Sequence, residues 1–389
     1  MWRILIPMST FTSKHIKSLI KQFPFIYPIR IIASCKEWID KQNIKGGLYK
    51  GMRGHTYEFK QIPENHALPL PRFSSDADAK KFSANVFYQT TAAYLFYLKD
   101  CYVFKQMGLV LSNRGAVFQE FTHHFNITSL FRFLVNHPFY TYSRKIKKID
   151  GIGAMLVSPQ SHNYYHWLFD VLPRIGLYNT VLDQVQHFCV SAEVPQKFIE
   201  ILPEFGIPVN KVLLIDDNEK LHFDTLFVAS LPGSEGRSPK WGIDYVREKL
   251  LKTPPSLNPT RKIYFKRGSV AKRKILNEES IINLLTAQGF EIIDSGQLSI
   301  AEQIMLMHDA RIIVALHGAA LGNLLFASDK CSVVEIFSPD YFRTDCYYTL
   351  ASLLKMDYHY ISGSKSANAN WGDIIVSEEA LTETLNRII

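Results

Sequence analysis

The chain has 389 residues, of which 47% are hydrophobic and 21% are charged, as in ordinary globular proteins. This length suffices for two domains with sizeable cores, and the composition excludes a largely disordered or fibrous protein. The net charge of +8 suits a polyanionic partner, such as a nucleic acid, an anionic lipid surface or a phosphorylated small molecule. Because the sequence has no RNA-recognition or zinc-finger pattern, we expect no nucleic-acid partner.

The cysteines and the apolar segments bear on location. The five cysteines are scattered and form no Cys-x-x-Cys pair, which argues against a sulfur-bound zinc ion and favours a reducing compartment. No apolar segment reaches the roughly 18 residues that span a bilayer. Met1–Met8 is too short an apolar stretch for a signal peptide. We therefore expect a cytoplasmic protein.

Residues 13–23 predict a basic amphipathic helix, because their apolar side chains fall on one helical face and three lysines lie elsewhere. Such a helix can lie on an anionic bilayer and hold a protein peripherally on the inner face of the cytoplasmic membrane. The alternative is a surface helix that packs on its own domain.

The remainder of residues 1–150 reads as an irregular segment that contains strands. Apolar runs separated by turn signals predict strands at 97–99, 102–104, 108–111 and 116–118. From residue 151 onward, short apolar strands alternate with helical patterns, which indicates parallel sheets covered on both faces. The strands are expected at 154–157, 212–215, 225–229, 262–265, 291–293, 311–316 and 332–336, and helices at 277–288 and 299–308.

The proline-rich stretch Thr253–Pro259 is the best candidate for a domain linker. We therefore predict an α/β protein with an N-terminal domain at 1–252, of which 151–252 is the α/β part, and a C-terminal domain at 260–376. A final helix at 377–389 could pack back on the N-terminal domain. Two such halves predict a ligand cleft between them, at the carboxyl ends of the strands.

The segment His162–Asp170 places two imidazoles and a carboxylate at intervals of four residues. On a helix, His162, His166 and Asp170 line one face, each within reach of the next. This order of side chains suits a proton-relay dyad, a metal site or a hydrogen-bonded helix cap.

A second constellation follows the strand at 311–316, where His317–Asn323 reads as a glycine turn that opens a helix. The free N–H groups of a helix N-terminus favour an anion, and Gly318 allows a ligand to approach the backbone closely. A strand–helix turn whose glycine merely permits packing is the alternative.

Basic residues gather after another predicted strand, at Lys266–Arg267 and again at 272–274. Arginine suits bidentate phosphate binding, and lysine acts as a point charge. Although a solvated loop is the usual explanation of such a run, its position after a strand favours a diphosphate site. The chain has no Asp-x-Asp pattern at these segments that would hold a metal.

Taken together, His162–Arg174, Lys266–Arg267, Arg273 with Asn277–Glu278, Ser299–Gln303, His317–Asn323 and Val334–Glu335 resemble glycosyltransferase family 61 of the capsular polysaccharide type. The resemblance covers residues 150 to 340. It departs from the family where Lys266–Arg267 replaces a frequent Ser-Arg and where Gly322 replaces a frequent Thr.

The resemblance implies a GT-B fold, with two Rossmann-like α/β domains facing each other across a cleft. It also implies inverting, metal-independent transfer from a nucleotide-sugar donor, with a UDP-sugar as the first expectation. The acceptor would be a hydroxyl of a glycan or a lipid-linked saccharide in the synthesis of capsule, lipopolysaccharide or another surface polysaccharide. No cofactor is expected.

Residue by residue, the resemblance and the chemistry of the side chains assign the following roles. His166 is the expected general base and Asp170 fixes its tautomer, with Asp170 itself as base the alternative. His162 and Asn163 would position the acceptor or the sugar. The expected donor-binding residues are Arg174, Lys266, Arg267, Arg273, Asn277, Glu278, Gln303, His317, Gly318, Ala319, Leu321, Asn323 and Glu335.

Two other functions remain open from the sequence. A metal-dependent hydrolase would use His162, His166 and Asp170 as ligands. A non-catalytic protein that binds a nucleotide sugar or a glycan would keep the anion site without turnover.

Overall fold

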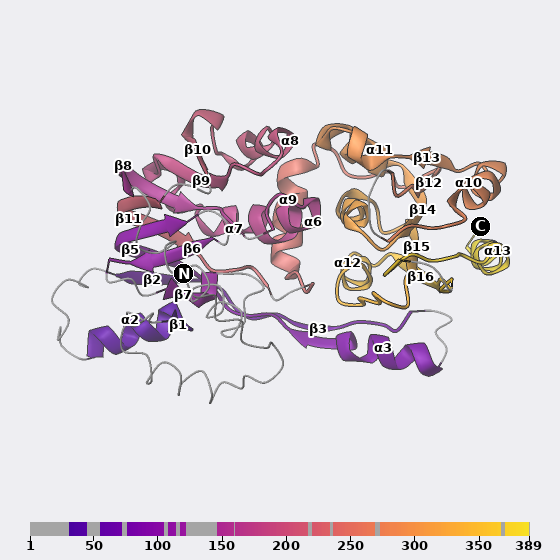
Figure 1. Cartoon of the computed structure of the whole chain (residues 1–389), viewed down its shortest axis with the longest axis horizontal. Coiled ribbons are helices and arrows are strands. Elements are labelled where there is room, and N and C mark those ends of the chain that lie inside the picture. Colours follow the sequence, from indigo (N-terminus) through magenta and orange to yellow (C-terminus); the bar gives the residue numbers. More distant parts are fainter. Residues whose placement is uncertain are drawn as a thin grey trace, which may run out of the picture.

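The computed structural model describes residues 31–44, 55–71, 76–104, 108–113, 117–121, 146–158, 160–216, 220–233, 236–268, 273–366 and 370–388. Two sheets form the framework, one in each half of the molecule (Figure 1). The predicted helix at 13–23 lies outside the described residues. Within the described part of the chain, no helix combines the length and the apolar character that crossing a bilayer requires.

The first sheet is mixed. Its order is β1-β7-β6-β5-β11-β8-β9-β10, with β2 paired to β5. Strands β8, β9, β10 and β11 run parallel, whereas β5 is antiparallel to β11, β2 and β6. The strands are β1 (Ile31–Ile32), β2 (Thr56–Gln61), β5 (Ala93–Phe104), β6 (Leu109–Ser112), β7 (Val117–Phe118), β8 (Ile146–Met155), β9 (His187–Ser191), β10 (Val212–Ile215) and β11 (Lys220–Ala229).

This sheet differs from the Rossmann-like, parallel sheet that we expected in the first half. The strands predicted at 154–157, 212–215 and 225–229 correspond to β8, β10 and β11, and β9 was not predicted. The strands expected before residue 120 add to the same sheet, and their short connections force antiparallel pairing of β5 with β6 and of β6 with β7. Strands β1, β2, β5, β6 and β7 of this segment therefore extend the first sheet.

The second sheet is wholly parallel, as predicted for the C-terminal domain, with the order β13-β12-β14-β15-β16. Its strands are β12 (Arg261–Phe265), β13 (Glu291–Ile293), β14 (Ala310–Leu316), β15 (Ser332–Phe337) and β16 (Asp357–Ser362), and the connecting segments include α10 (Glu278–Ala287), α11 (Ile300–His308), η7 (Ala319–Phe326) and α12 (Tyr347–Leu353). Helix α11 begins after a capping box, in which the Ser299 hydroxyl accepts from the Glu302 amide and the Glu302 carboxylate accepts from the Ser299 amide.

The strand order of the second sheet creates one topological switch point. The chain passes from β12 to β13 on one side and then returns to β14 on the other side of β12. Ligands of open α/β sheets bind in the crevice at the carboxyl ends of the strands where the order reverses. In this sheet that crevice lies beyond Phe265 and Leu316, directly before Arg267 and His317.

The C-terminal helix α13 (Glu378–Asn386) packs on the second sheet, contrary to our expectation that it could return to the first half. Its Leu381 and Leu385 are spaced by one helical turn and are buried in a core with Ile281 and Val376. The two leucines therefore pack on the second sheet, whose last strand, β16, precedes α13 in the chain.

A different segment crosses between the halves. Residues 64–71 and 76–90, here called the crossing arm, run along the second half and contain β3 (Asn65–Ala67), α3 (Asp76–Val86) and β4 (Phe87–Gln89) (Figure 1). Phe82 of the arm is fully buried, and its ring centroid lies 5.0 Å from that of Tyr348. The Tyr348 hydroxyl donates to the Pro69 carbonyl at 2.7 Å.

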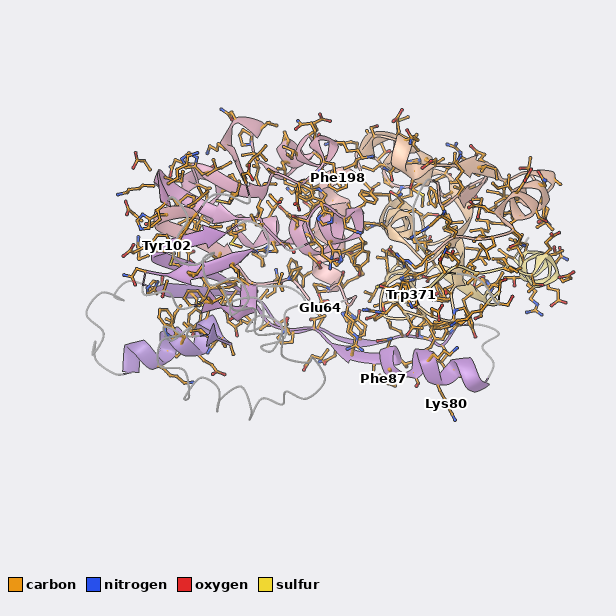
Figure 2. All side chains as sticks on the ribbon, viewed as in Figure 1. Glu64, Lys80, Phe87, Tyr102, Phe198 and Trp371 are labelled. Atoms are coloured by element: carbon orange, nitrogen blue, oxygen red, sulfur yellow. The ribbon has the colours of Figure 1, made fainter. Side chains whose placement is uncertain are left out.

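The largest apolar core extends through both halves. It contains Leu95 and Phe227 of the first sheet and Ile263 and Phe337 of the second. Phe198, labelled near the middle of the molecule in Figure 2, belongs to the same core. The two halves therefore meet through packed side chains.

Candidate active site

The histidine segment forms an irregular helix. Asn163 caps its start by accepting a 2.9 Å hydrogen bond from the Tyr165 amide. A short helical turn, α6 (Tyr164–His166), is followed by a π-helical turn, η2 (Trp167–Val171), and by α7 (Leu172–Leu177). Turns of the π type are rare and often mark functional positions. His162 precedes the cap and lies outside the helix. The prediction that His162 shares a helical face with His166 and Asp170 is therefore wrong.

His166 and Asp170 form a close pair. The imidazole Nδ1 lies 2.6 Å from the Asp170 carboxylate, and both side chains are largely buried. With Nδ1 donating to the carboxylate, Nε2 is the basic nitrogen, and the carboxylate stabilises the imidazolium that forms when Nε2 takes a proton. The predicted dyad is therefore assembled in the geometry of a general base.

His162 lies apart from this pair. Its side chain is half exposed, and its Nδ1 is 3.9 Å from the Glu193 carboxylate. In the described ranges, no group of three or more His, Cys, Asp or Glu side chains is arranged to hold a metal ion. The hydrolase alternative therefore lacks the ligand set that it requires among these residues.

The glycine turn is anchored by a buried hydrogen-bonded group. Nδ1 of His317 lies 2.5 Å from one oxygen of Glu335, and the other oxygen accepts from the Tyr358 hydroxyl at 2.5 Å. Burial, and next the charge of Glu335, raise the pKa of Tyr358, which keeps this hydroxyl a donor. His317 and Glu335 thus fix the turn from inside the protein.

Two arginines meet the turn from its open side. A β-carbon on Gly318 would lie 2.2 Å from Nη1 of Arg267, so the guanidinium rests directly against the glycine. Arg273 reaches the His317 carbonyl at 3.5 Å and lies over the ring of Tyr341 at 4.6 Å. Burial, and next the positive charge of Arg273, lower the pKa of Arg267.

This grouping is suited to an anion. Two guanidinium groups of like charge approach each other at the carboxyl ends of β12 and β14, beside the first residues of η7. The first N–H groups of a helix have no partner within the helix, and they favour negative charge. We call Arg267, Arg273, Gly318 and Ala319 the cationic cradle; Ala319 is the first residue of η7 and is partly exposed.

Other predicted donor residues support the cradle from behind. The Glu278 carboxylate accepts from the Arg267 amide and from the Tyr264 hydroxyl, each at 2.9 Å. The Asn277 amide is engaged by the backbone of Val376 through two hydrogen bonds. Lys266 has an exposed side chain at the rim. The structure brings these residues to the predicted place, where Asn277 and Glu278 hold the backbone.

Gln303 and Asn323 lie in the interior. The Asn323 amide donates to the Gln303 side chain at 2.7 Å, and Gln303 donates to the Leu298 carbonyl at 3.3 Å. Leu321 is also fully buried, and its amide donates to the Gly318 carbonyl at 3.0 Å. These residues stabilise η7, and their side chains are buried, so they support the turn from inside; direct donor contact stays a prediction.

Arg174 also differs from our expectation. It is fully buried, and its guanidinium donates to the carbonyls of Met155, Val157 and Ala229 at 3.0 to 3.2 Å. Burial lowers its pKa, and the nearby Tyr178 and Asp170 act in the opposite direction. Arg174 therefore joins α7 to the ends of β8 and β11 and does not contact a donor.

Aromatic residues that the sequence analysis did not select connect the dyad to the cradle. The ring of Tyr165 lies 5.4 Å from that of His166 and 5.6 Å from that of Tyr347, and the ring of Tyr347 lies 5.2 Å from that of His317. The sequence signal that could have identified Tyr347 is the doublet Tyr347-Tyr348, which follows the strand at 332–336 and its loop. The two constellations are thus parts of one region.

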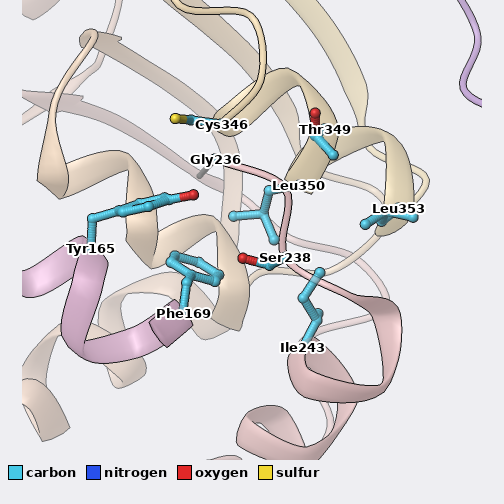
Figure 3. Close-up of a pocket in the computed structure, with 9 residues that line it drawn as sticks. All are labelled: Tyr165, Phe169, Gly236, Ser238, Ile243, Cys346, Thr349, Leu350 and Leu353. Carbon is cyan, nitrogen blue, oxygen red and sulfur yellow. The ribbon is translucent and has the colours of Figure 1, made fainter. Parts of the chain in front are cut away.

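An apolar pocket lies where the histidine helix meets α12. Figure 3 shows Tyr165 and Phe169 pointing from the histidine helix toward α12, where Leu350 and Cys346 face them. Ser238 and Ile243 close the pocket from the segment before and within α9 (Lys240–Leu250). This packing holds Tyr165 between the dyad and α12.

The comparison with known families bears on the resemblance. The sequence model described as Glycosyltransferase 61 matches residues 164–334. Residues 164–334 are thus similar to glycosyltransferase family 61. The matched span contains the His166–Asp170 dyad, both cradle arginines and the glycine turn, so the family region and the assembled site coincide.

Two relatives illustrate what this chain is similar to. The EGF domain-specific O-linked N-acetylglucosamine transferase of Mus musculus is 35% identical over 102 residues, which are 25% of this chain and 19% of the relative. The protein O-linked-mannose beta-1,4-N-acetylglucosaminyltransferase 2 of Tetraodon nigroviridis is 34% identical over 116 residues, which are 28% of this chain and 19% of the relative. The chain thus spans about a fifth of the length of these curated relatives.

Proposed function

We propose that this protein is a glycosyltransferase that moves a sugar from a nucleotide-sugar donor to a hydroxyl of a glycan or a lipid-linked saccharide. The observation that carries the proposal is the meeting of the cationic cradle with the His166–Asp170 dyad through Tyr165 and Tyr347. A base and an anion site in one region are what a displacement reaction with a diphosphate leaving group requires. The two sheet-containing halves would act as the two halves of a GT-B enzyme.

The proposed reaction is one in-line displacement. The acceptor hydroxyl gives its proton to Nε2 of His166 while its oxygen forms a bond to the anomeric carbon of the donor sugar. The bond between that carbon and the diphosphate oxygen breaks, and the nucleoside diphosphate leaves with the electron pair. The attack comes from the face opposite to the leaving group, so the anomeric configuration is inverted.

The protein's own charges serve each end of this displacement. Asp170 stabilises the imidazolium of His166, and its carboxylate is already committed to that histidine at 2.6 Å, which favours His166 as the base. Arg267 and Arg273 offset the negative charge that develops on the diphosphate, together with the N–H groups at the start of η7. Because these arginines can supply the positive charge that the leaving diphosphate needs, we propose a reaction without a metal.

Donor and acceptor follow from different observations. The names of both relatives specify transfer of N-acetylglucosamine, so UDP-N-acetylglucosamine is the first donor to test. The net charge of +8 favours an acceptor on a lipid diphosphate, as in surface polysaccharide synthesis, with peripheral membrane contact through residues 13–23. The names of the relatives point to protein-linked acceptors, which form the second arm of the test.

Calorimetry in the presence of EDTA tests the donor part. The full chain is titrated with UDP, GDP, CMP and dTDP, then with the matching nucleotide sugars. Selective binding of one nucleotide under EDTA supports the proposal, and the configuration of the transferred sugar is then read by NMR. Absence of binding across the panel, or a requirement for an added divalent cation, would overturn the metal-free cradle.

A further inference from the structure

Trp371 presents an exposed aromatic surface beside the cradle. Its side chain is 56% exposed, whereas Trp38 and Trp167 are 4% and 0% exposed. Figure 2 labels it on the half of the molecule that holds the parallel sheet. A large aromatic side chain that remains this accessible next to cationic groups is a candidate contact for a planar ligand group.

The turn that carries Trp371 is held from two sides. On one side the Lys274 amide donates to the Asp373 carboxylate at 2.8 Å. On the other side the Gly372 amide donates to the Asp340 carboxylate at 3.0 Å. Gly372 has a φ of +83°, a conformation that favours glycine, so the turn depends on this residue. The indole is therefore presented from an ordered backbone.

The same turn touches the cradle directly. A β-carbon on Gly372 would lie 2.5 Å from Cγ of Arg273, so the arginine stem rests on the backbone next to Trp371. The ring of Trp371 lies 5.9 Å from that of Tyr341, nearly edge to face, and Arg273 lies over the same Tyr341 ring. In the described ranges Arg273 forms no ion pair with a carboxylate, so its charge remains available to a phosphate.

We propose that Trp371 stacks against the nucleobase of the donor, an inference that rests on the proposed function because it takes the diphosphate to lie at Arg267 and Arg273. A nucleoside diphosphate bound there would carry its base to one side of the two arginines. Trp371 is the neighbour of Gly372, on whose backbone Arg273 rests, and its ring lies 5.9 Å from that of Tyr341. Base–aromatic stacking is tolerant of base identity, so Trp371 contributes affinity for the nucleoside without selecting the base.

Titration of the full chain with UDP and with inorganic pyrophosphate separates stacking from phosphate binding. Stacking on one aromatic ring is worth about 1–3 kcal/mol, so Trp371→Ala should weaken UDP binding by about 5- to 150-fold. Pyrophosphate affinity should stay within about twofold of that of the wild type, and Trp371→Phe should retain most of the affinity for UDP. Leu257→Ala, which removes a side chain that is 83% exposed in the linker, is the matched control and should change neither affinity.

Intrinsic fluorescence gives a second readout. UDP should quench the tryptophan emission of the wild type, pyrophosphate should not, and Trp371→Phe should lose that quenching. Unchanged UDP affinity in Trp371→Ala, or an equal loss of pyrophosphate binding, would overturn the stacking assignment while leaving the cradle in place. A wild-type protein that binds neither ligand would instead refute the proposed function, and the stacking assignment with it.

Discussion

The Tyr164 hydroxyl donates a 2.7 Å hydrogen bond to Oδ1 of Asn323, although 159 positions separate the two residues in the sequence. Tyr164 opens the histidine helix, and Asn323 lies within η7, the helix that follows the cationic cradle. Asn323 is fully buried, and its side-chain amide donates a hydrogen bond to Gln303. These hydrogen bonds therefore join the start of the histidine helix to η7, the helix that begins at the cationic cradle.

Tyr164→Phe should destabilise this connection. The change leaves the buried Asn323 oxygen without its donor, which costs about 1–3 kcal/mol in the free energy of unfolding. Urea denaturation monitored by circular dichroism measures the loss. Tyr97→Phe removes a hydroxyl that bonds to the half-exposed Glu58 on the first sheet and should cost far less. Equal effects of the two changes would contradict a special role for the Tyr164 bond.

His166→Ala should abolish sugar transfer while nucleoside diphosphate binding persists. Positioned general bases contribute roughly 10²–10⁴-fold, so the turnover rate should fall by that factor. Asp170→Asn should also reduce turnover, because the asparagine cannot stabilise the imidazolium. The measurement is donor turnover at saturating acceptor, with calorimetry of UDP on the same samples. Turnover near the wild-type rate in His166→Ala would show that another group takes the proton.

Gly318→Ala should displace Arg267. The added methyl would lie 2.2 Å from Nη1 of this arginine, which no real contact permits, so the guanidinium has to leave the turn. We expect weaker nucleoside diphosphate binding with unchanged overall stability, measured by calorimetry and by thermal unfolding. Gly289→Ala is not a neutral comparison because that glycine has a φ of +79°. Gly296→Ala, where the nearest atom lies at 3.2 Å, is the better control.

Arg174→Met should reduce stability by at least about 2 kcal/mol. The change removes the guanidinium from three buried carbonyls. The Met155 carbonyl still accepts from the Tyr178 hydroxyl at 2.8 Å, but those of Val157 and Ala229 lose this donor, and unsatisfied buried groups carry the full cost of desolvation. Lys266→Met, at an exposed basic residue, should stay within about 0.5 kcal/mol. Denaturation midpoints give both values. A variant Arg174→Met that keeps its stability and loses only UDP affinity would restore the donor-binding role that we first expected.

His55 should make stability depend on pH in the weakly acid range. Burial lowers the pKa of this imidazole from 6.5 to about 4, so the folded protein favours the neutral form. Its contribution is fully present above pH 6.5 and is lost as the pH falls from 6.5 toward 4, up to about 3 kcal/mol.

The His55→Asn variant isolates that contribution. An asparagine oxygen can replace Nδ1 as the acceptor of the Lys99 amide, which the histidine binds at 3.1 Å. Denaturation curves of the wild type and of His55→Asn between pH 4 and 8 should differ most at the acid end. Parallel curves across that range would show that His55 keeps an ordinary pKa.

The sequence predicted those helices and strands whose signals lie within the element itself. The strand at 311–316 is an apolar run that needs no partner to be recognised, and the helix at 299–308 carries its capping box in the sequence. Strand β16 was missed because Asp357, His359 and Ser362 interrupt its apolar pattern. Its side chains are buried by long-range packing, such as that of Tyr358 against Phe82 and Tyr348, which the local pattern does not reveal.

Residue chemistry alone predicted the place of the site better than the role of each residue. Arg267 and His317 follow adjacent parallel strands, so their meeting was predictable from strand order. Arg174 is charged and lies in the family motif, yet it serves buried carbonyls of strands β8 and β11, and those contacts are visible only after folding. The burial of Phe82 among aromatic residues more than 250 positions away could not be inferred from any local pattern.

The core that extends through both halves has a consequence for how the molecule divides. A cut at the proline-rich stretch would separate the two sheets in sequence but would leave the apolar surface of each half open to water. The crossing arm would also remain with the first half, while the aromatic side chains that enclose Phe82 would remain with the second. We therefore expect the two halves to fold as one unit, and replacing either half by that of another protein would require a matching apolar face.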